Sequence, residues 1–168
     1  VFMLILSHLL AAKGYFHIHC SAVERYGKGV LLPGFSGAGK STACIALIRK
    51  GFRFLGDDRP LFTAGDGGLR LFAFPEEIDV TDRSIDLFPE LKDVVALEDP
   101  GPGRKKSFFA DRVYPGVISD SCVPEFILYP RVTPRAESSL EPMSKSDALS
   151  AFLPHSLFVM DRETTKRH

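Results

Sequence analysis

Residues 31–42 constrain the fold of this chain more than any other stretch. They read LLPGFSGAGKST and place Gly34, Gly39, Lys40 and Ser41 in the pattern Gly-x-x-x-x-Gly-Lys-[Ser/Thr]. Glycines allow successive backbone N–H groups to turn toward one centre, and the positive N-terminal end of a following helix strengthens their attraction for phosphate. The pattern therefore predicts a buried strand, a phosphate-binding loop and a helix in that order.

Side-chain chemistry assigns roles within residues 34–42, which we call the phosphate loop. Lys40 can reach the outer phosphates of a nucleotide, and the Ser41 hydroxyl can bind Mg²⁺. The alternative is a glycine-rich turn that binds no ligand. The predicted cofactor-binding residues of the loop are Gly34, Phe35, Ser36, Gly37, Ala38, Gly39, Lys40, Ser41 and Thr42.

Apolar patterning around the loop predicts an α/β fold. A buried strand precedes the loop, a helix over 40–50 ends at Gly51, and further short strands alternate with turns. The apolar residues of the strand are Val30, Leu31 and Leu32, and those of the helix face are Ala43, Ala46, Leu47 and Ile48. We also expect helices over 2–12, within 84–96 and from 144, strands over 15–23, 52–56, 69–74, 107–110 and 125–129, turns at 26–29 and 65–68, and an exposed loop at 99–103.

Composition limits the remaining function classes. The chain has 168 residues, 45% of them hydrophobic, which predicts one domain over 1–168 with a substantial core. Lys+Arg and Asp+Glu number 21 each, so no overall positive field would attract nucleic acid or an anionic membrane. Residues 1–12 are apolar but too short to span a bilayer and lack the basic start of a signal peptide. The chain begins with Val1, as expected of a piece of a longer protein.

Cysteine usage indicates a reducing compartment. The three cysteines are Cys20, Cys44 and Cys122, an odd number without metal-ligand spacing. Free thiols of this kind are typical of the cytoplasm, where disulfides are rare. We therefore expect a cytoplasmic protein.

The pair Asp57-Asp58 follows the strand predicted after the loop's helix. In an α/β sheet, strands of one polarity end at the same crevice, so both carboxylates are expected beside the bound phosphates. One carboxylate can hold Mg²⁺, and its neighbour can accept a proton from an attacking hydroxyl. The alternative is that the pair only caps the turn at Pro60.

Two histidines, His17 and His19, are expected on one face of the strand over 15–23. His19 could lie beside the aspartates and assist a proton transfer or contact the metal. His17 is expected to be a half-buried structural histidine. A His-x-His pair is also half of a zinc site, but the sequence offers no third ligand.

Basic residues near a proline-glycine loop form a further candidate. Arg104, Lys105 and Lys106 could move over a transferring phosphoryl group and stabilise its charge, or could simply be a solvated surface. Arg59, next to the aspartates, could act in the same way or form a salt bridge to them.

The stretch HIHCSAVERYGKGVLLPGFSGAGKSTACIALIRKGFRFLGDD, residues 17–58, resembles the catalytic core of the HPr kinase/phosphorylase family and its bacterial relatives. ATP-dependent phosphoenolpyruvate carboxykinases are similar over the loop and over Gly56-Asp57-Asp58. The resemblance implies a phosphate-loop nucleotide-binding domain with a mixed, twisted sheet flanked by helices. It also implies ATP and Mg²⁺ as cofactors and assembly into homo-oligomers.

Matching positions carry the family's active-site roles onto this chain. The resemblance makes His19 the active-site histidine, Lys40 the phosphate-binding residue and Ser41 a magnesium ligand. It makes Asp57 and Asp58 the acidic pair, for which we expect Asp57 to be the base and Asp58 the metal ligand. The catalytic set is thus His19, Lys40, Asp57 and Asp58, and the metal ligands are Ser41 and Asp58.

One departure from the family changes the expected substrate. The sequence lacks the glycine-rich segment that HPr kinases carry after the acidic pair for substrate capture and the reverse reaction. The sequence therefore predicts a kinase that phosphorylates serine on a peptide or protein other than HPr. The alternatives are a small-molecule kinase and a nucleotide-binding sensor that transfers nothing, while the chain is too short for the substrate domain of a carboxykinase.

Overall fold

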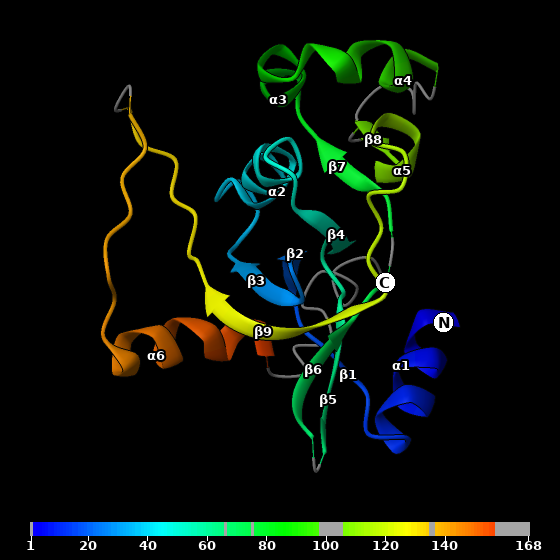
Figure 1. The fold of residues 1–168 in the computed structure, drawn as a ribbon, viewed down its shortest axis with the longest axis vertical. Coiled ribbons are helices and arrows are strands. Elements are labelled where there is room, and N and C mark those ends of the chain that lie inside the picture. The colour runs from blue at the N-terminus through cyan, green and yellow to red at the C-terminus, as the bar shows by residue number, and fades with distance from the viewer. Residues whose placement is uncertain (1, 66, 75, 98–105, 135–136, 157–168) are drawn as a thin grey trace, which may run out of the picture.

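A computed structural model describes residues 2–65, 67–74, 76–97, 106–134 and 137–156 (Figure 1). The helices are α1 (Phe2–Ala12), α2 (Lys40–Ile48), α3 (Asp82–Leu87), the 3₁₀ helix η1 (Pro89–Leu91), α4 (Lys92–Leu97), α5 (Ala110–Val113) and α6 (Lys145–Ser156). The strands are β1 (Phe16–His17), β2 (Cys20–Arg25), β3 (Lys28–Pro33), β4 (Arg53–Gly56), β5 (Leu61–Gly65), β6 (Gly68–Phe72), β7 (Ile78–Val80), β8 (Lys106–Phe108) and β9 (Ser121–Ile127).

Seven strands form one mixed sheet in the order β1-β5-β6-β9-β3-β2-β4, and β7 pairs with β8 in a second sheet. The α/β fold with a mixed sheet is thus confirmed. Strand β2 lies between β3 and β4 and runs antiparallel to both, so β3 and β4 run in the same direction. Their carboxyl ends therefore share one sheet edge with the start of β2, and this edge positions the candidate site.

Two hairpins occur where the turn residues predict them. Arg25 pairs with Lys28 across a turn whose residues Tyr26 and Gly27 have φ of 56° and 80°. Positive φ at both central positions matches the right-handed twist of the flanking strands. The second hairpin joins β5 to β6 with Gly65 opposite Gly68.

The strand expected over 15–23 is interrupted at Ile18 and His19, so that prediction was wrong in its continuity. The segment before the break pairs with β5, whereas the segment after it pairs with β3 and β4. The Ile18 N–H donates to the Pro60 carbonyl at 3.2 Å, and the His19 N–H donates to the His155 carbonyl at 3.0 Å. Long-range partners therefore break a pattern that reads locally as one strand.

Helix α2 buries most of the expected face together with two further side chains. Ile48 is buried and Ala43 and Leu47 pack partly buried against the core, as predicted, while Ala46 is exposed and Cys44 and Ile45 are also buried. The helix also ends at Ile48 rather than residue 50, and Gly51 with φ of 86° turns the chain into β4. Among the later elements, α5 begins at Ala110, where a strand was expected to continue, and the expected loop at 99–103 lies outside the described residues.

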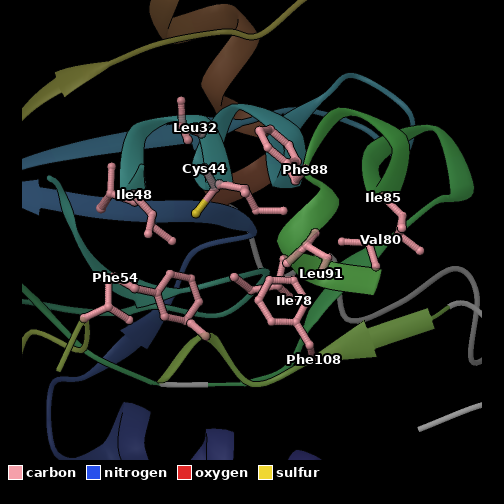
Figure 2. Close-up of a cluster of buried hydrophobic side chains, with 14 of the residues drawn as sticks. Leu32, Cys44, Ile48, Phe54, Ile78, Val80, Ile85, Phe88, Leu91 and Phe108 are labelled. Atoms are coloured by element: carbon pink, nitrogen blue, oxygen red, sulfur yellow. The ribbon is translucent and has the colours of Figure 1, made fainter. Parts of the chain in front are cut away.

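Two clusters of buried apolar side chains cover the two faces of the sheet. The larger cluster lies between α2, the strands and the β7–β8 unit, and it includes Val23, Leu32 and Phe54 (Figure 2). The smaller cluster includes Ala22, Leu31 and Leu55, with Phe152 of α6 packed against it. Because neighbouring strand residues point to opposite faces, β2, β3 and β4 contribute to both clusters. No helix in the described ranges is long and apolar enough to cross a membrane.

Candidate active site

The phosphate loop follows β3 and turns directly into α2. Gly37 and Gly39 have φ of 83° and 97°, a region that side-chain-bearing residues rarely adopt. A Cβ atom on Gly34 would lie 3.0 Å from the Ala38 Cβ, so a larger residue would require Ala38 to shift. No side chain caps the N-terminus of α2. These features suit backbone N–H groups that bind phosphate.

Lys40 is the first residue of α2 and is 8% exposed. Its Nζ lies 3.4 Å from the Phe35 carbonyl oxygen at the start of the loop. The ammonium group is therefore held against the loop, where the sequence predicts outer phosphates. Phe35 itself is 70% exposed.

Asp57 follows β4 and lies inside the site, with 4% exposure. Its carboxylate accepts a hydrogen bond from Ser41 Oγ at 3.0 Å and another from Ser21 Oγ. Burial raises the pKa of the Asp57 carboxyl, and the two serine hydrogen bonds oppose that shift. The loop serine and the first aspartate are therefore in direct contact.

The Asp58 side chain lies beside His19 and not beside Ser41 and Ser21 as Asp57 does. Its backbone is left-handed, with φ of 72°, a conformation that Asp tolerates better than most residues. The side chain is 45% exposed, and its Oδ1 lies 3.8 Å from His19 Nδ1. Two adjacent aspartates thus face two different surroundings, because the chain leaves β4 at Gly56 and turns at Asp58.

His17 is a structural residue at the end of β1 that contacts the turn carrying Asp58. Its Nδ1 lies 3.0 Å from the Arg59 carbonyl oxygen, and its ring packs edge-on against Phe74. Burial lowers the pKa of His17. The break between β1 and β2 separates its environment from that of His19, so the two histidines do not act as a pair.

Arg59 is exposed beside the site. Burial raises the pKa of the nearby Glu76 carboxyl, the positive charge of Arg59 opposes this shift, and the negative charges of Asp58 and Asp57 add to it. Glu76 therefore brings a third carboxyl toward the pair.

Lys106 and Thr42 direct their side chains at α3 rather than into the site, and two further expected positions cannot be placed. Arg104 and Lys105 lie outside the described residues. Lys106, their neighbour, donates from Nζ to Asp82 Oδ1 at 2.7 Å and is held at α3. Thr42 Oγ1 lies 3.1 Å from Ser84 Oγ, so this hydroxyl is directed at α3 rather than at the loop.

Two site residues were missed by sequence reasoning. Ser21 is a fully buried hydroxyl among apolar neighbours in β2, and a buried hydroxyl requires a hydrogen-bond partner, which was a usable signal. His155 stacks on His19 with ring centroids 6.0 Å apart. It comes from the far end of the chain, and no local pattern marks it.

The donor set suits a hard divalent cation. Ser41 and Asp57 offer hydroxyl and carboxylate oxygens in contact with each other, the ligand type that Mg²⁺ prefers, and Mg²⁺ at nucleotide sites completes its shell with phosphates and water. The other expected ligand, Asp58, lies beside His19 instead. Within the described ranges, no group of three or more His, Cys, Asp or Glu side chains is arranged to hold a metal.

Comparisons with known proteins give the following matches. Residues 10–74 match the family model described as HPr Serine kinase C-terminal domain. HPr kinase/phosphorylase from Streptococcus thermophilus is 43% identical over 61 residues, which make up 36% of this chain and 19% of the relative. The enzyme of the same name from Lactobacillus delbrueckii subsp. bulgaricus is 50% identical over 42 residues, 25% of this chain and 13% of the relative.

A solved structure, the HPr(Ser) kinase/phosphatase from Coxiella burnetii, superposes with a TM-score of 0.47 at 15% identity. The superposition covers 71% of this chain and 70% of that one. The chain thus spans a minor part of the length of the curated relatives, 19% for the Streptococcus protein.

The matched residues 10–74 include every residue of the phosphate loop, His19 and the acidic pair. The resemblance indicated by residues 17–58 is therefore confirmed: over residues 10–74 this chain is similar to the HPr kinase C-terminal domain.

Proposed function

We propose that this chain is the catalytic part of an ATP- and Mg²⁺-dependent kinase that transfers the γ-phosphoryl group to a serine hydroxyl of a peptide or protein. One observation carries the proposal. Ser41 of the phosphate loop contacts Asp57, and Asp58, the next residue, lies beside His19. A phosphate-binding loop and two differently placed carboxylates at one sheet edge are the parts that phosphoryl transfer requires. The similarity to HPr kinases supports the same reaction.

The contacts favour an assignment of the aspartates opposite to the one expected from the sequence. Asp57 shares its surroundings with Ser41, the residue expected to bind Mg²⁺, so we assign Asp57 to the metal side. Asp58 is half-exposed beside His19 and can meet an incoming hydroxyl, so we assign it as the base.

In the proposed step, the acceptor oxygen forms a bond to the γ-phosphorus, the bond from that phosphorus to the bridging oxygen breaks, and ADP leaves. The acceptor proton passes to Asp58, with the His19 imidazole beside it. Lys40 and the loop N–H groups stabilise the negative charge on the phosphoryl oxygens. ATP supplies the phosphoryl group when bound, and Mg²⁺ neutralises charge on the phosphates.

The identity of the phosphate acceptor is proposed from one feature of the sequence. The sequence lacks the glycine-rich segment that the resemblance associates with HPr capture, so we propose a serine of another peptide or protein. A cytoplasmic location and assembly into homo-oligomers are further parts of this proposal, taken from the cysteine content and the family resemblance.

The test uses three forms of the chain: wild type, Lys40→Ala and Asp58→Asn. Each is incubated with γ-labelled ATP, Mg²⁺ and a lysate of the source cells. We expect Lys40→Ala to weaken ATP binding, because it removes the cation held at the loop. Asp58→Asn should bind ATP normally and lose about 10²–10⁴-fold of the transfer rate, the usual contribution of a general base.

The position of the label decides among the alternatives. Label on a protein or peptide that requires Asp58 supports the proposal. Label only in small molecules would replace it with a metabolite kinase, and ATP binding without any transfer would replace it with a sensor. Normal transfer by Asp58→Asn would return the role of base to Asp57.

A further inference from the structure

Helix α6 brings the far end of the described chain to the active site. Figure 1 shows the chain leaving β9, running away from the sheet and returning through α6. Two contacts seat the helix: Phe152 packs against the smaller core cluster, and Tyr129 Oη donates to the Ala148 carbonyl at 2.6 Å. The last turn of α6 is therefore fixed relative to β2.

His155, in that last turn, contacts two residues of the site. Its ring centroid lies 6.0 Å from that of His19 with an interplanar angle of 21°, and 5.0 Å from that of Phe35. Its carbonyl oxygen accepts a hydrogen bond from the His19 N–H at 3.0 Å. The residue is 5% exposed. His155 thus joins the phosphate loop to the histidine beside Asp58.

His19 needs such a partner because of its place in the chain. It lies at the interruption between β1 and β2, so its N–H bonds to α6 instead of a neighbouring strand. Its side chain is 50% exposed, and a solvated histidine ring samples several rotamers. A ring stacked on one face removes part of that freedom.

We propose that His155 is a positioning residue that holds the His19 imidazole beside Asp58 through ring stacking and a backbone hydrogen bond. The inference rests on the proposed kinase function for its effect on rate. The positioning itself can be measured without any transfer.

The electrostatic surroundings agree with this role. Burial lowers the pKa of His155, and the nearby His19 and Lys40 lower it further. A neutral ring at this position adds no positive charge against Lys40. His155 can therefore stack on His19 without competing for the phosphates.

The experiment uses the full chain labelled with ¹³C in the histidine rings, as wild type and as His155→Ala, His155→Phe and Leu149→Ala. Both His155 variants keep the backbone carbonyl that accepts from His19, and only His155→Phe keeps a ring. Leu149→Ala shortens an exposed side chain of the same helix as a control. We expect the His19 ring resonances of His155→Ala to move toward those of a freely rotating histidine. His155→Phe and Leu149→Ala should keep a restricted His19 ring.

A second readout separates positioning from nucleotide binding. His155→Ala should lower kcat for phosphoryl transfer, or for ATP hydrolysis if no acceptor is known, by roughly ten- to hundredfold, while Kd for ATP stays within about twofold. His155→Phe should recover most of the rate. The conservative variant keeps the test valid if His155→Ala fails to fold.

Two results would overturn the inference: an unchanged His19 ring in His155→Ala, or equal losses of ATP affinity and kcat in both His155 variants. A chain that neither transfers nor hydrolyses phosphate would overturn the proposed kinase function instead. In that case the His19 resonances alone decide the positioning role.

Discussion

At the scale of single residues, the neighbours Asp57 and Asp58 destabilise the fold in different ways, Asp57 through burial of its carboxylate and Asp58 through its backbone conformation. Asp57 is buried, and its two serine hydrogen bonds offset only part of the cost of removing a carboxylate from water. Asp58 is half-exposed but adopts a left-handed backbone conformation. The contacts of His17 with the Arg59 carbonyl and of Ile18 with the Pro60 carbonyl hold this conformation in place. Such strain is typical of functional sites.

Neutralising Asp57 should stabilise the metal-free chain. Because burial raises the folded-state pKa of this carboxyl above its unfolded value, the ionised group costs stability at every pH above the unfolded pKa. We expect Asp57→Asn to raise Tm by about 2–4 °C at pH 7 in the presence of a chelator, while transfer is lost. Thermal unfolding followed by circular dichroism measures the shift.

Asp120→Asn, which removes an exposed carboxylate, is the matched control and should leave Tm within about 1 °C of wild type. A lower Tm for Asp57→Asn would show that the serine hydrogen bonds stabilise the ionised group more than burial destabilises it.

At the scale of elements, the phosphate loop shows how much local sequence determines. The strand before it, the helix after it and both hairpins were predicted, because glycine positions and apolar runs act over a few residues. The interruption at Ile18 and His19 was not predicted, because its cause lies in Pro60 and in α6. The inward face of α2 was predicted only in part, since the burial of Cys44 and Ile45 depends on where β7 and α3 pack against the helix.

Alanine substitutions of the loop glycines should destabilise the chain by amounts that follow the backbone strain at each position. Gly37→Ala places a side chain at φ of 83° in open space, and Gly39→Ala adds a Cβ contact of 3.2 Å with Val132 to a φ of 97°. We expect Gly37→Ala to lower the free energy of unfolding by about 1–2 kcal/mol and Gly39→Ala by more. Urea denaturation measures both, and ATP affinity should fall in the same order.

Gly67→Ala provides the control, since Gly67 has neither a positive φ nor a neighbour within 4 Å of an added Cβ. A loss of stability in Gly67→Ala as large as that in Gly37→Ala would show that general glycine effects, and not the loop conformation, are being measured.

At the scale of the whole molecule, the strand order of the sheet explains why most site residues come from one short part of the sequence. The residue that was not predicted comes from a distant part. Strand β2 lies between β3 and β4, so one sheet edge collects the phosphate loop, the acidic pair and His19. The acidic pair and His19 could be proposed together from their strand positions and from the family resemblance. His155 could not, because its place depends on the path of the chain from β9 to α6.

The buried histidines should make global stability depend on pH. Burial lowers the folded-state pKa of His17 and of His155, so near and below pH about 6.5 the unfolded chain binds more protons than the folded chain. Their contribution is complete above that pH and is lost as the pH falls toward the folded-state values, with a slope of at most about 1.4 kcal/mol per pH unit for each histidine.

Urea unfolding between pH 7.5 and 5.5 measures this slope. We expect His155→Phe to reduce the slope of unfolding free energy against pH by the contribution of one histidine, because phenylalanine keeps the packing and cannot be protonated. A slope that is the same in His155→Phe and wild type would contradict a lowered pKa for His155.

The late position of α6 also has a consequence for biosynthesis. A ribosome releases the phosphate loop, the acidic pair and His19 long before it releases His155. A nascent chain can therefore form the nucleotide cradle while the His19 ring still lacks its stacking partner. Synthesis of α6 would then be the step that gives the His19 ring its stacking partner.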